Sequence, residues 1–276
     1  MMESQLEQLL LQMQISGFCI LENVIPTDHC AAIRESLIEV VQRHRGDYPN
    51  APTNVGFTPS VINHDQSFAR YLADETLLVL IGRLLGEHIR ISFTSAIINE
   101  PRNQRGGWHA DWPFNQTNAG HVPAPYPDAV MHITTLWMLT PFDAENGGTL
   151  VFPGSHRCPT NPTAENGPDP HEEFAGETNA TGQAGSVLVM DSRLWHATSP
   201  NRTEHPRVAL AVRYAPWWLN LEVLRPGSDE RKRMCDEAGE TDNIVPSILP
   251  DVYDRLPANV QALFRHWVGP GEPVVI

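Results

Sequence analysis

The chain has 276 residues, of which 41% are hydrophobic, so it can bury a substantial core in one large or two small domains, and global disorder is excluded. Its formal net charge of −14 makes nucleic acid a poor partner, and no block of Lys and Arg suggests an anionic membrane surface. The four cysteines form no CxxC pair, which excludes a zinc ribbon or a thioredoxin motif.

The N-terminal third is expected to be mainly helical. Residues 3–14 have apolar positions at helical spacing and predict a short helix, without the basic segment and cleavage site of a signal peptide. The run "GFCILENVI" predicts a strand, and "PTDHCAAIRESLIEVVQRH" predicts a helix with Thr27 as its N-cap. Residues 46–64, rich in Pro, Asn and Gly, predict a loop, and two short helices are expected over 66–73 and 75–85.

From about residue 88 the sequence changes to β-branched or alternating runs separated by Gly, Pro and Asn. These runs are "IRISFTSAIINE", "AVMHITTLWML", "GTLVFP", "GSVLVMD" and "RVALAVRYA". The polar stretch 157–183 predicts a long insertion between strands, and long loops in compact domains are often lids. Helices are expected again over 228–238 and 251–267.

These elements favour a single domain over residues 1–276, since no internal repeat or interdomain linker is visible. The 24 prolines and 19 glycines favour a loop-rich β fold over a helix bundle. We expect a mainly β fold with flanking helices, an antiparallel barrel or jelly roll whose core covers about 88–218. The helical ends would be extensions of this core, and 157–183 its lid. With no apolar run as long as a membrane span, we expect a cytoplasmic protein with reduced thiols.

The triplet His109-Ala-Asp111, within "RGGWHADWPF", is the first candidate for chemistry. On a strand, residues i and i+2 point to the same face, so an imidazole and a carboxylate could reach one metal ion. One such triplet is a weak signal, and a second at His171-Glu-Glu, in the polar insertion, is interpreted as a solvated loop. The first gains weight from His196, which ends an apolar strand downstream. Two His and one carboxylate form the facial triad of non-haem Fe(II) oxygenases.

Arg207 follows His196 by eleven residues and opens the next β run. On adjacent antiparallel strands both side chains could face inward, and a buried Arg requires a partner. Its planar fork suits a carboxylate, which suggests a keto-acid cosubstrate that chelates the iron. Arg202 and Arg213 are alternatives, and Arg213 could share the face of Arg207 because the two are an even number of positions apart. His205, in a turn, is the alternative to His196 as a ligand.

Several stretches resemble the phytanoyl-CoA dioxygenase family of Fe(II)- and 2-oxoglutarate-dependent oxygenases. They are "WHADWPF", "NGGTLVFPGSHR" at 146–157 and "WHATSPNRTEHPRVALAVRY" at 195–214. The N-terminal "GFCILENVIPTDHCAAIRESL" resembles the family's opening helix and strand, so the likeness covers most of 17–215. The stretch around "NGGTLVFPGSH" is expected to shape the barrel rim, because Asn-Gly-Gly is a turn signature and Pro-Gly breaks the strand that follows it.

The resemblance implies a double-stranded β-helix, which is a cupin-like jelly roll. It also implies Fe(II) as the cofactor, with 2-oxoglutarate and O2 as cosubstrates. His109, Asp111 and His196 would be the iron ligands. Arg207 would bind the distal carboxylate of 2-oxoglutarate, and Thr198 matches a Ser or Thr position that often helps to bind this cosubstrate in the family.

Aromatic residues close to these positions suggest an apolar pocket that excludes water and holds an organic substrate. The residues expected to shape this pocket are Trp112, Phe114, Trp137 and Trp217. Plain core packing is the alternative for Trp137 and Trp217. On the strand "HITTLWML", Trp137 and Thr135 would share one face, and Thr134 and Leu136 the other.

The expected function is a dioxygenase that hydroxylates an unactivated C–H bond of a small organic molecule, with release of succinate and CO2. Halogenases of this type lack the ligating carboxylate, so Asp111 disfavours halogenation, whereas desaturation, epoxidation, ring formation and endoperoxidation stay open. An acyl-CoA site would need clustered basic residues, and none lies near the candidate pocket. The other classes are an oxygen-independent, cupin-like hydrolase or isomerase and a non-catalytic sensor or binding protein. Consumption of O2 and 2-oxoglutarate separates the first interpretation from both.

Overall fold

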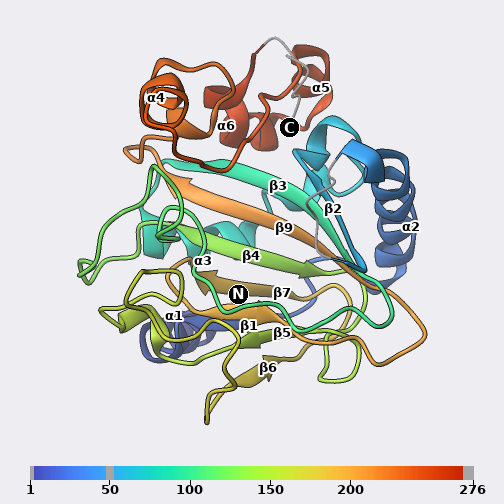
Figure 1. The fold of residues 1–276 in the computed structure, drawn as a ribbon. Helices are drawn as coiled ribbons and strands as arrows, with labels where there is room; N and C mark the ends of the chain where they lie inside the picture. The colour runs from blue at the N-terminus through green and yellow to red at the C-terminus, as the bar shows by residue number, and fades with distance from the viewer. Residues whose placement is uncertain (1–2, 48–52, 270–276) are drawn as a thin grey trace.

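Two antiparallel β-sheets lie at the centre of the protein, with helices around the larger one (Figure 1). The computed structural model describes residues 3–47 and 53–269. The larger sheet has the strand order β1-β7-β4-β9-β3-β2, and the smaller has the order β6-β5-β8. These two antiparallel sheets confirm the expected jelly roll.

Each apolar or β-branched run that predicted a strand carries one in the structure. The strands of the larger sheet are β1 (Phe18–Leu21), β2 (Val55–Pro59), β3 (Ile89–Asn99), β4 (Ile133–Met138), β7 (Val187–Asp191) and β9 (Arg207–Pro216). Those of the smaller sheet are β5 (Thr149–Val151), β6 (Thr178–Ala180) and β8 (His196–Thr198). The helices are α1 (Glu3–Ser16), α2 (Thr27–His44), α3 (Glu75–Leu85), α4 (Asp229–Arg231), α5 (Pro250–Arg255) and α6 (Ala258–Phe264).

Alternation along β3, β4 and β9 separates the inside of the roll from the helical layer. Residues in register across antiparallel strands lie on one face, so Phe93, Arg213 and Thr134 form one row on the inner face. The next inner row, two positions along each strand, is Ser95, Ala211 and Leu136. The residues that alternate with them along the strands, such as Ala96 and Val212, face the helices and are buried in the main core.

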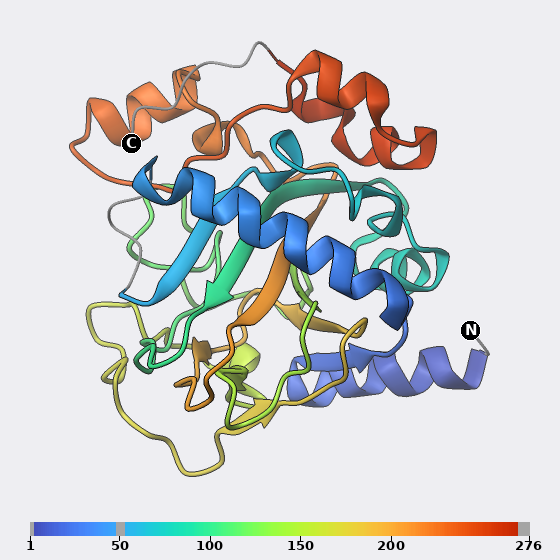
Figure 2. The ribbon, with the colours of Figure 1, turned by 90° about the vertical axis from the view of Figure 1, so that its right-hand side faces the viewer.

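Helix α2 closes the outer face of the larger sheet. Its residues Ile33, Leu37, Val40 and Val41 recur at helical spacing and are buried. The helix crosses the outer side of β2, β3 and β9 (Figure 2). Helix α1 packs against β1, and the C-terminal helices lie beyond β3 at the edge of the sheet (Figure 1). Within the part of the chain that the structure describes, no helix is both long and apolar enough to cross a bilayer.

The predicted loop over 46–64 is wrong in part, because it contains β2. Gly56, which contributed to the loop prediction, is required inside this strand by the close approach of α2. A Cβ at this position would lie 2.6 Å from a methyl carbon of Val41. Residues 48–52 of the same stretch lie outside the described residues.

The ends and lengths of several helices also differ from the prediction. Pro26, with extended backbone angles, is the N-cap of α2, so Thr27 lies inside the helix. Over 66–73 only a 3-10 turn at Ala69–Tyr71 forms, because the Asp65 carboxylate accepts a hydrogen bond from Ser67 N and sets a local turn.

Two more differences concern the C-terminal part and the insertion. The helix expected over 228–238 is the short α4 followed by a π-helical turn at Lys232–Asp236. Pro257 divides the helix expected over 251–267 into α5 and α6, since proline offers no N–H to continue the ladder. The insertion 157–183 contains β6, a strand that its polar sequence did not indicate.

Candidate metal centre

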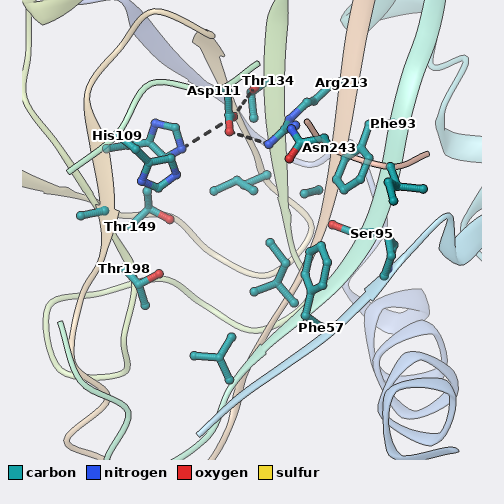
Figure 3. A pocket seen from close by; sticks show the side chains of 18 of the residues that line it. Phe57, Phe93, Ser95, His109, Asp111, Thr134, Thr149, Thr198, Arg213 and Asn243 are labelled. Carbon is teal, nitrogen blue, oxygen red and sulfur yellow. Dashed lines mark hydrogen bonds and ion pairs between the residues drawn. The ribbon is translucent and has the colours of Figure 1, made fainter. Parts of the chain in front are cut away.

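His109, Asp111 and His196 come together in the lining of a cavity between the two sheets. Figure 3 shows His109 and Asp111 in this cavity. Each offers one ligand atom, and these atoms lie within 4.8 Å of one another. The distance from His196 Nε2 to Asp111 Oδ2 is 3.6 Å, and the imidazole ring centres are 4.3 Å apart. Two imidazole nitrogens and a carboxylate oxygen in this arrangement could hold a divalent metal ion.

The backbone around these residues is a loop joined to a strand, which corrects the expectation that the His109 triplet lies on a strand. His109 and His196 form an isolated antiparallel bridge, with N···O distances of 3.1 and 3.0 Å between their main chains. Asp111 N donates to Ser192 O at 2.8 Å. The loop therefore takes its position from β8 and from the turn before it, while i and i+2 still direct both side chains to the same place.

Backbone carbonyls orient both imidazoles. The Nδ1 atom of His109 lies 3.0 Å from Gly107 O, and that of His196 lies 2.9 Å from Leu194 O. A proton on each Nδ1 leaves Nε2 free for a metal, the usual arrangement of histidine ligands. Burial, followed by the neighbouring His109, lowers the pKa of His196 to about 4, so this imidazole is neutral near pH 7.

Asp111 is held as an ionised carboxylate by two residues of the larger sheet. Thr134 Oγ1 donates to Oδ2 at 2.6 Å, and Arg213 Nη2 donates to Oδ1 at 2.5 Å. Burial alone would raise the pKa of Asp111, but Arg213, with smaller contributions from His196 and His109, brings it well below the ordinary value. Arg213 entered the sequence analysis only as an alternative to Arg207, and its even spacing from Arg207 was the signal that it faces the site.

Arg207 lines the same cavity, but not in the way that the sequence suggested. Strands β8 and β9 belong to different sheets, so His196 and Arg207 are not on adjacent strands and reach the cavity from opposite sides. The spacing of eleven residues spans a crossover between the sheets, which sequence distance alone does not distinguish from a hairpin.

The guanidinium of Arg207 is buried with only part of its hydrogen-bonding capacity used. Its Nε donates to Gly147 O at 2.8 Å, and the group lies 4.6 Å from the centre of the Phe142 ring. Its Nη1 is buried and has no hydrogen-bond partner among the described residues. Burial lowers the pKa of Arg207 to about 9, the direction expected of a cation that lacks a nearby anion.

The cavity itself has a volume of about 530 Å³, within the range of small-molecule sites. Thr149 and Thr198 lie on the side of the smaller sheet, close to the imidazoles (Figure 3). The wall opposite is largely apolar. Its apolar residues are Val55, Phe57, Pro59, Phe93, Ile97, Leu136, Ala211 and Ile244.

None of the four aromatic residues expected to shape the pocket lines this cavity. Trp112 is buried with its ring edge-on to His132, and Phe114 is buried against Tyr126. Trp137 faces the main core, where its Nε1 donates to Thr135 Oγ1, and Trp217 is 63% exposed. Three of these residues are therefore packed in the interior beyond the cavity lining, and Trp217 lies on the surface.

The two faces of β4 are nevertheless as predicted, because Thr134 and Leu136 line the cavity while Thr135 and Trp137 are in the core. The aromatic wall instead comes from Phe57 on the unpredicted strand β2 and Phe93 on β3. Alternation in "ISFTSAII" was the signal for Phe93. The alternative ligand His205 is exposed in its turn, away from the cavity lining.

Comparison with protein families and known proteins identifies the family of the chain. Residues 13–209 match the model of the family described as phytanoyl-CoA dioxygenase (PhyH). Dioxygenase af480 of Aspergillus fumigatus is 33% identical over 171 residues, which cover 62% of this chain. The same alignment covers 50% of af480, so the chain spans about half the length of this relative.

Solved structures show the same fold at low sequence identity. HygX from Streptomyces hygroscopicus, with nickel, 2-oxoglutarate and hygromycin B bound, superposes with a TM-score of 0.64 at 17% identity. This match covers 86% of this chain and 96% of HygX. The epimerase SnoN, in complex with Fe3+, alpha ketoglutarate and nogalamycin RO, gives a TM-score of 0.58 at 18% identity, over 77% of this chain and 84% of SnoN.

Proposed function

The chain belongs to the phytanoyl-CoA dioxygenase family, whose class is that of the non-haem iron, 2-oxoglutarate-dependent dioxygenases, and from this premise we propose that it hydroxylates an unactivated C–H bond of a small organic molecule. One observation carries the proposal. A buried guanidinium with an unpaired nitrogen, that of Arg207, shares a cavity with the cluster of His109, Asp111 and His196. An oxygen-independent metalloenzyme would account for the cluster but would have no use for this cation.

The residues present fit both iron and 2-oxoglutarate. Two imidazoles and one ionised carboxylate are the donor set of the facial triad, which leaves other positions on the metal open. The unpaired Nη1 of Arg207 supplies the donor that a distal carboxylate requires. Thr198 lines the same cavity from the smaller sheet and is the second proposed contact of the cosubstrate.

When bound, iron and 2-oxoglutarate supply the oxidising chemistry, in which O2 converts 2-oxoglutarate to succinate and CO2 while a substrate C–H bond is hydroxylated. The chain's own residues orient the metal ligands and the substrate and exclude water from the cavity. Arg213 and Thr134 fix the orientation of the Asp111 carboxylate, and the carbonyls of Gly107 and Leu194 fix the imidazoles. The apolar wall excludes water and holds the substrate, so that geometry selects the C–H bond that reacts.

We also propose that the chain works as one catalytic unit in the cytoplasm. The cavity lining draws on β2 near the N-terminus, on the strands of the roll and on residues 242–244 near the C-terminus, which supports a single unit. All four cysteines are unpaired, as expected of a reducing compartment. Small molecules are the proposed substrates, as hygromycin B and nogalamycin RO are bound by the structural neighbours.

A second outcome of the same chemistry is favoured by one comparison. SnoN is described as an epimerase that binds alpha ketoglutarate, so the fold accommodates reactions other than hydroxylation. Asp111 occupies the position that a halide would require, which disfavours halogenation. Product analysis with the true substrate distinguishes hydroxylation from epimerisation, desaturation or ring formation.

Metal binding tests the proposal. We expect one Fe(II) per chain by anaerobic titration, and loss of that binding in His109→Ala and in His196→Ala. His205→Ala, which removes an exposed histidine of a nearby turn, is the matched control and should bind iron normally. The wild-type enzyme should release succinate in an O2-dependent reaction. Unimpaired Fe(II) binding in both ligand variants would overturn the ligand assignment.

A further inference from the structure

Ser95 presents a buried hydroxyl group to the cavity. The residue lies on β3 between Phe93 and Ile97, which face the cavity with it, and none of its surface is exposed to solvent. In Figure 3 its hydroxyl points into the space between Phe57, Phe93 and the imidazoles. Its Oγ has no hydrogen-bond partner among the described residues, although buried hydroxyls normally have one.

The position of Ser95 relative to the metal centre follows from the strand register. Ser95, Ala211 and Leu136 form the inner row next to that of Phe93, Arg213 and Thr134, the row that contacts Asp111. Successive inner rows are two residues apart, which is roughly 7 Å along the strands. A molecule that bonds to Ser95 would therefore have atoms several bonds away beside the metal ligands.

The other charged groups of the cavity are already engaged or already assigned. Arg213 pairs with Asp111, and Arg207 is the proposed partner of the cosubstrate. Asp242 accepts hydrogen bonds from Gly120 N at 2.7 Å and from Asn243 N at 2.6 Å. Each charged group of the described lining thus has a hydrogen-bond partner or an assigned role, and the wall around Ser95 is apolar.

We infer that Ser95 determines specificity by a hydrogen bond from its Oγ to a hydroxyl or carbonyl oxygen of a neutral, mainly apolar substrate. This inference rests on the proposed function and deepens it, because the bond fixes which part of the substrate lies at the metal. The excluded classes are acyl-CoA thioesters, free carboxylates and amines, since each would bring an unpaired charge into an apolar wall. An alicyclic alcohol or ketone fits the volume and the single polar contact.

The test uses four probes with the same cage skeleton: 2-adamantanone, 1-adamantanol, 1-adamantanecarboxylate and 1-adamantylammonium. Their dissociation constants are measured by calorimetry on the anaerobic enzyme loaded with Fe(II) and 2-oxoglutarate. We expect the ketone and the alcohol to bind at least about tenfold more tightly than either charged probe. Equal or tighter binding of a charged probe, or no binding of either neutral probe at millimolar concentration, would overturn the substrate class.

The role of Ser95 is tested by variants on the same assay. Ser95→Ala should weaken 2-adamantanone binding about five- to tenfold, the loss of one neutral hydrogen bond, while the affinities for Fe(II) and 2-oxoglutarate stay within about twofold. Ser95→Thr keeps the hydroxyl and should retain most of the binding, and Ser95→Cys, a weak donor of similar size, should behave like Ser95→Ala. Agreement between the two hydroxyl-lacking variants also guards against a folding artefact.

Thr58→Val is the matched control. Thr58 lies on the adjacent strand β2, is fully buried and has an equally unpartnered Oγ1, but it does not line the cavity. This variant should bind the ketone as the wild type does. Unchanged ketone affinity in Ser95→Ala, or an equal loss in Thr58→Val, would refute the assignment. Failure of wild-type iron or 2-oxoglutarate binding would instead refute the proposed function, so the two failures are distinguishable.

Discussion

Strand β9 carries two arginines that face the same cavity in opposite circumstances. Arg213 forms an ion pair with Asp111. Arg207 contacts a backbone carbonyl and an aromatic ring, and one of its buried nitrogens has no partner among the residues that the structure describes. They are six residues apart on one face of one strand, so the backbone directs both side chains toward the cavity. What differs is the source of the anion: for Arg213 the chain supplies it, and for Arg207 we propose that the cosubstrate does.

This contrast separates residues that build the centre from residues that receive a ligand. A charge paired within the protein fixes the position of a side chain before anything binds. A buried charge without a partner costs free energy in the empty protein, and an anionic ligand that pairs with it recovers that cost on binding. The two arginines should therefore respond differently to the same substitution.

The largest effect is expected for Arg207→Ala on the binding of 2-oxoglutarate. Truncating one partner of a buried charge pair costs roughly 2–5 kcal/mol, which corresponds to about thirty-fold to a few thousand-fold in affinity. Arg207→Lys should retain only part of the wild-type affinity for 2-oxoglutarate, because the point charge of an ammonium group does not reproduce the planar guanidinium. Calorimetry on the Fe(II)-loaded, anaerobic protein measures this, and iron affinity should be unchanged.

Arg202→Ala is the control for this experiment, since Arg202 is an exposed arginine of the turn before β9. It should bind 2-oxoglutarate normally. If Arg207→Ala also binds 2-oxoglutarate normally while Arg213→Ala does not, the roles assigned to the two arginines of β9 are reversed.

Arg213→Ala should instead weaken the affinity for Fe(II). Without this partner the Asp111 carboxylate loses one of its two side-chain hydrogen bonds, and changes in residues that orient metal ligands typically weaken metal binding about 10- to 100-fold. At saturating iron, the affinity for 2-oxoglutarate should change only a few-fold. An Fe(II) titration checks the first expectation, and wild-type iron affinity would show that Arg213 does not hold the ligand.

A smaller effect is expected on stability below pH 7. His132 is fully buried between the hydroxyls of Ser92 and Ser192, and burial, followed by the charge of Arg213, lowers its pKa to about 3. The unfolded chain takes up a proton near pH 6.5 and the folded protein does not. The free energy of unfolding should therefore decrease as the pH falls from 7 to 5, and about 2 kcal/mol of this loss of stability is attributable to His132.

Urea unfolding of the metal-free protein at pH 7 and pH 5 measures that loss. His132→Gln keeps a donor and an acceptor but does not titrate, so its stability should fall less over this interval than that of the wild type. Identical pH dependence in the two proteins would mean that His132 is not held neutral.

The smallest effect concerns the insertion 157–183, which contrasts with the rigid strands. Its residues 171–173 are exposed, while Asn161 is buried with its side chain donating to Phe114 O, and Glu177 pairs with Arg105 on both carboxylate oxygens. We predict that amide exchange between these anchors slows several-fold when 2-oxoglutarate and substrate bind without oxygen. Full protection in the free protein would exclude a gating role for the segment.

The sequence predicted the sheets and the residues of the metal cluster because their patterns are local. Alternation identifies β3, β4 and β9, and the spacing of His109 and Asp111 directs both side chains one way even without a strand. The partners of a side chain depend on how segments cross in space. Strand β2 was hidden by Gly56, and the assignment of Arg213 to Asp111 joins residues 102 positions apart.

The aromatic residues illustrate the same limit. Trp112 and Phe114 are close to the metal cluster in sequence, yet they are buried behind the cavity, because the turn after Asp111 carries them into the core. Proximity in sequence to a candidate metal ligand thus indicated that these rings are buried. It did not indicate whether they face the cavity or the core behind it. Phe57, far away in sequence, lines the cavity because β2 pairs with β3.

A crystal structure of the anaerobic protein with Fe(II) and 2-oxoglutarate tests the central claim most directly. We expect anomalous density for one iron within about 2.0–2.2 Å of a nitrogen of His109, a nitrogen of His196 and an oxygen of Asp111. The distal carboxylate of 2-oxoglutarate should lie within hydrogen-bonding distance of the Arg207 guanidinium, with Arg213 still paired to Asp111. Iron at any other set of residues, or a carboxylate bound to Arg213 while Arg207 stays unpaired, would contradict the account.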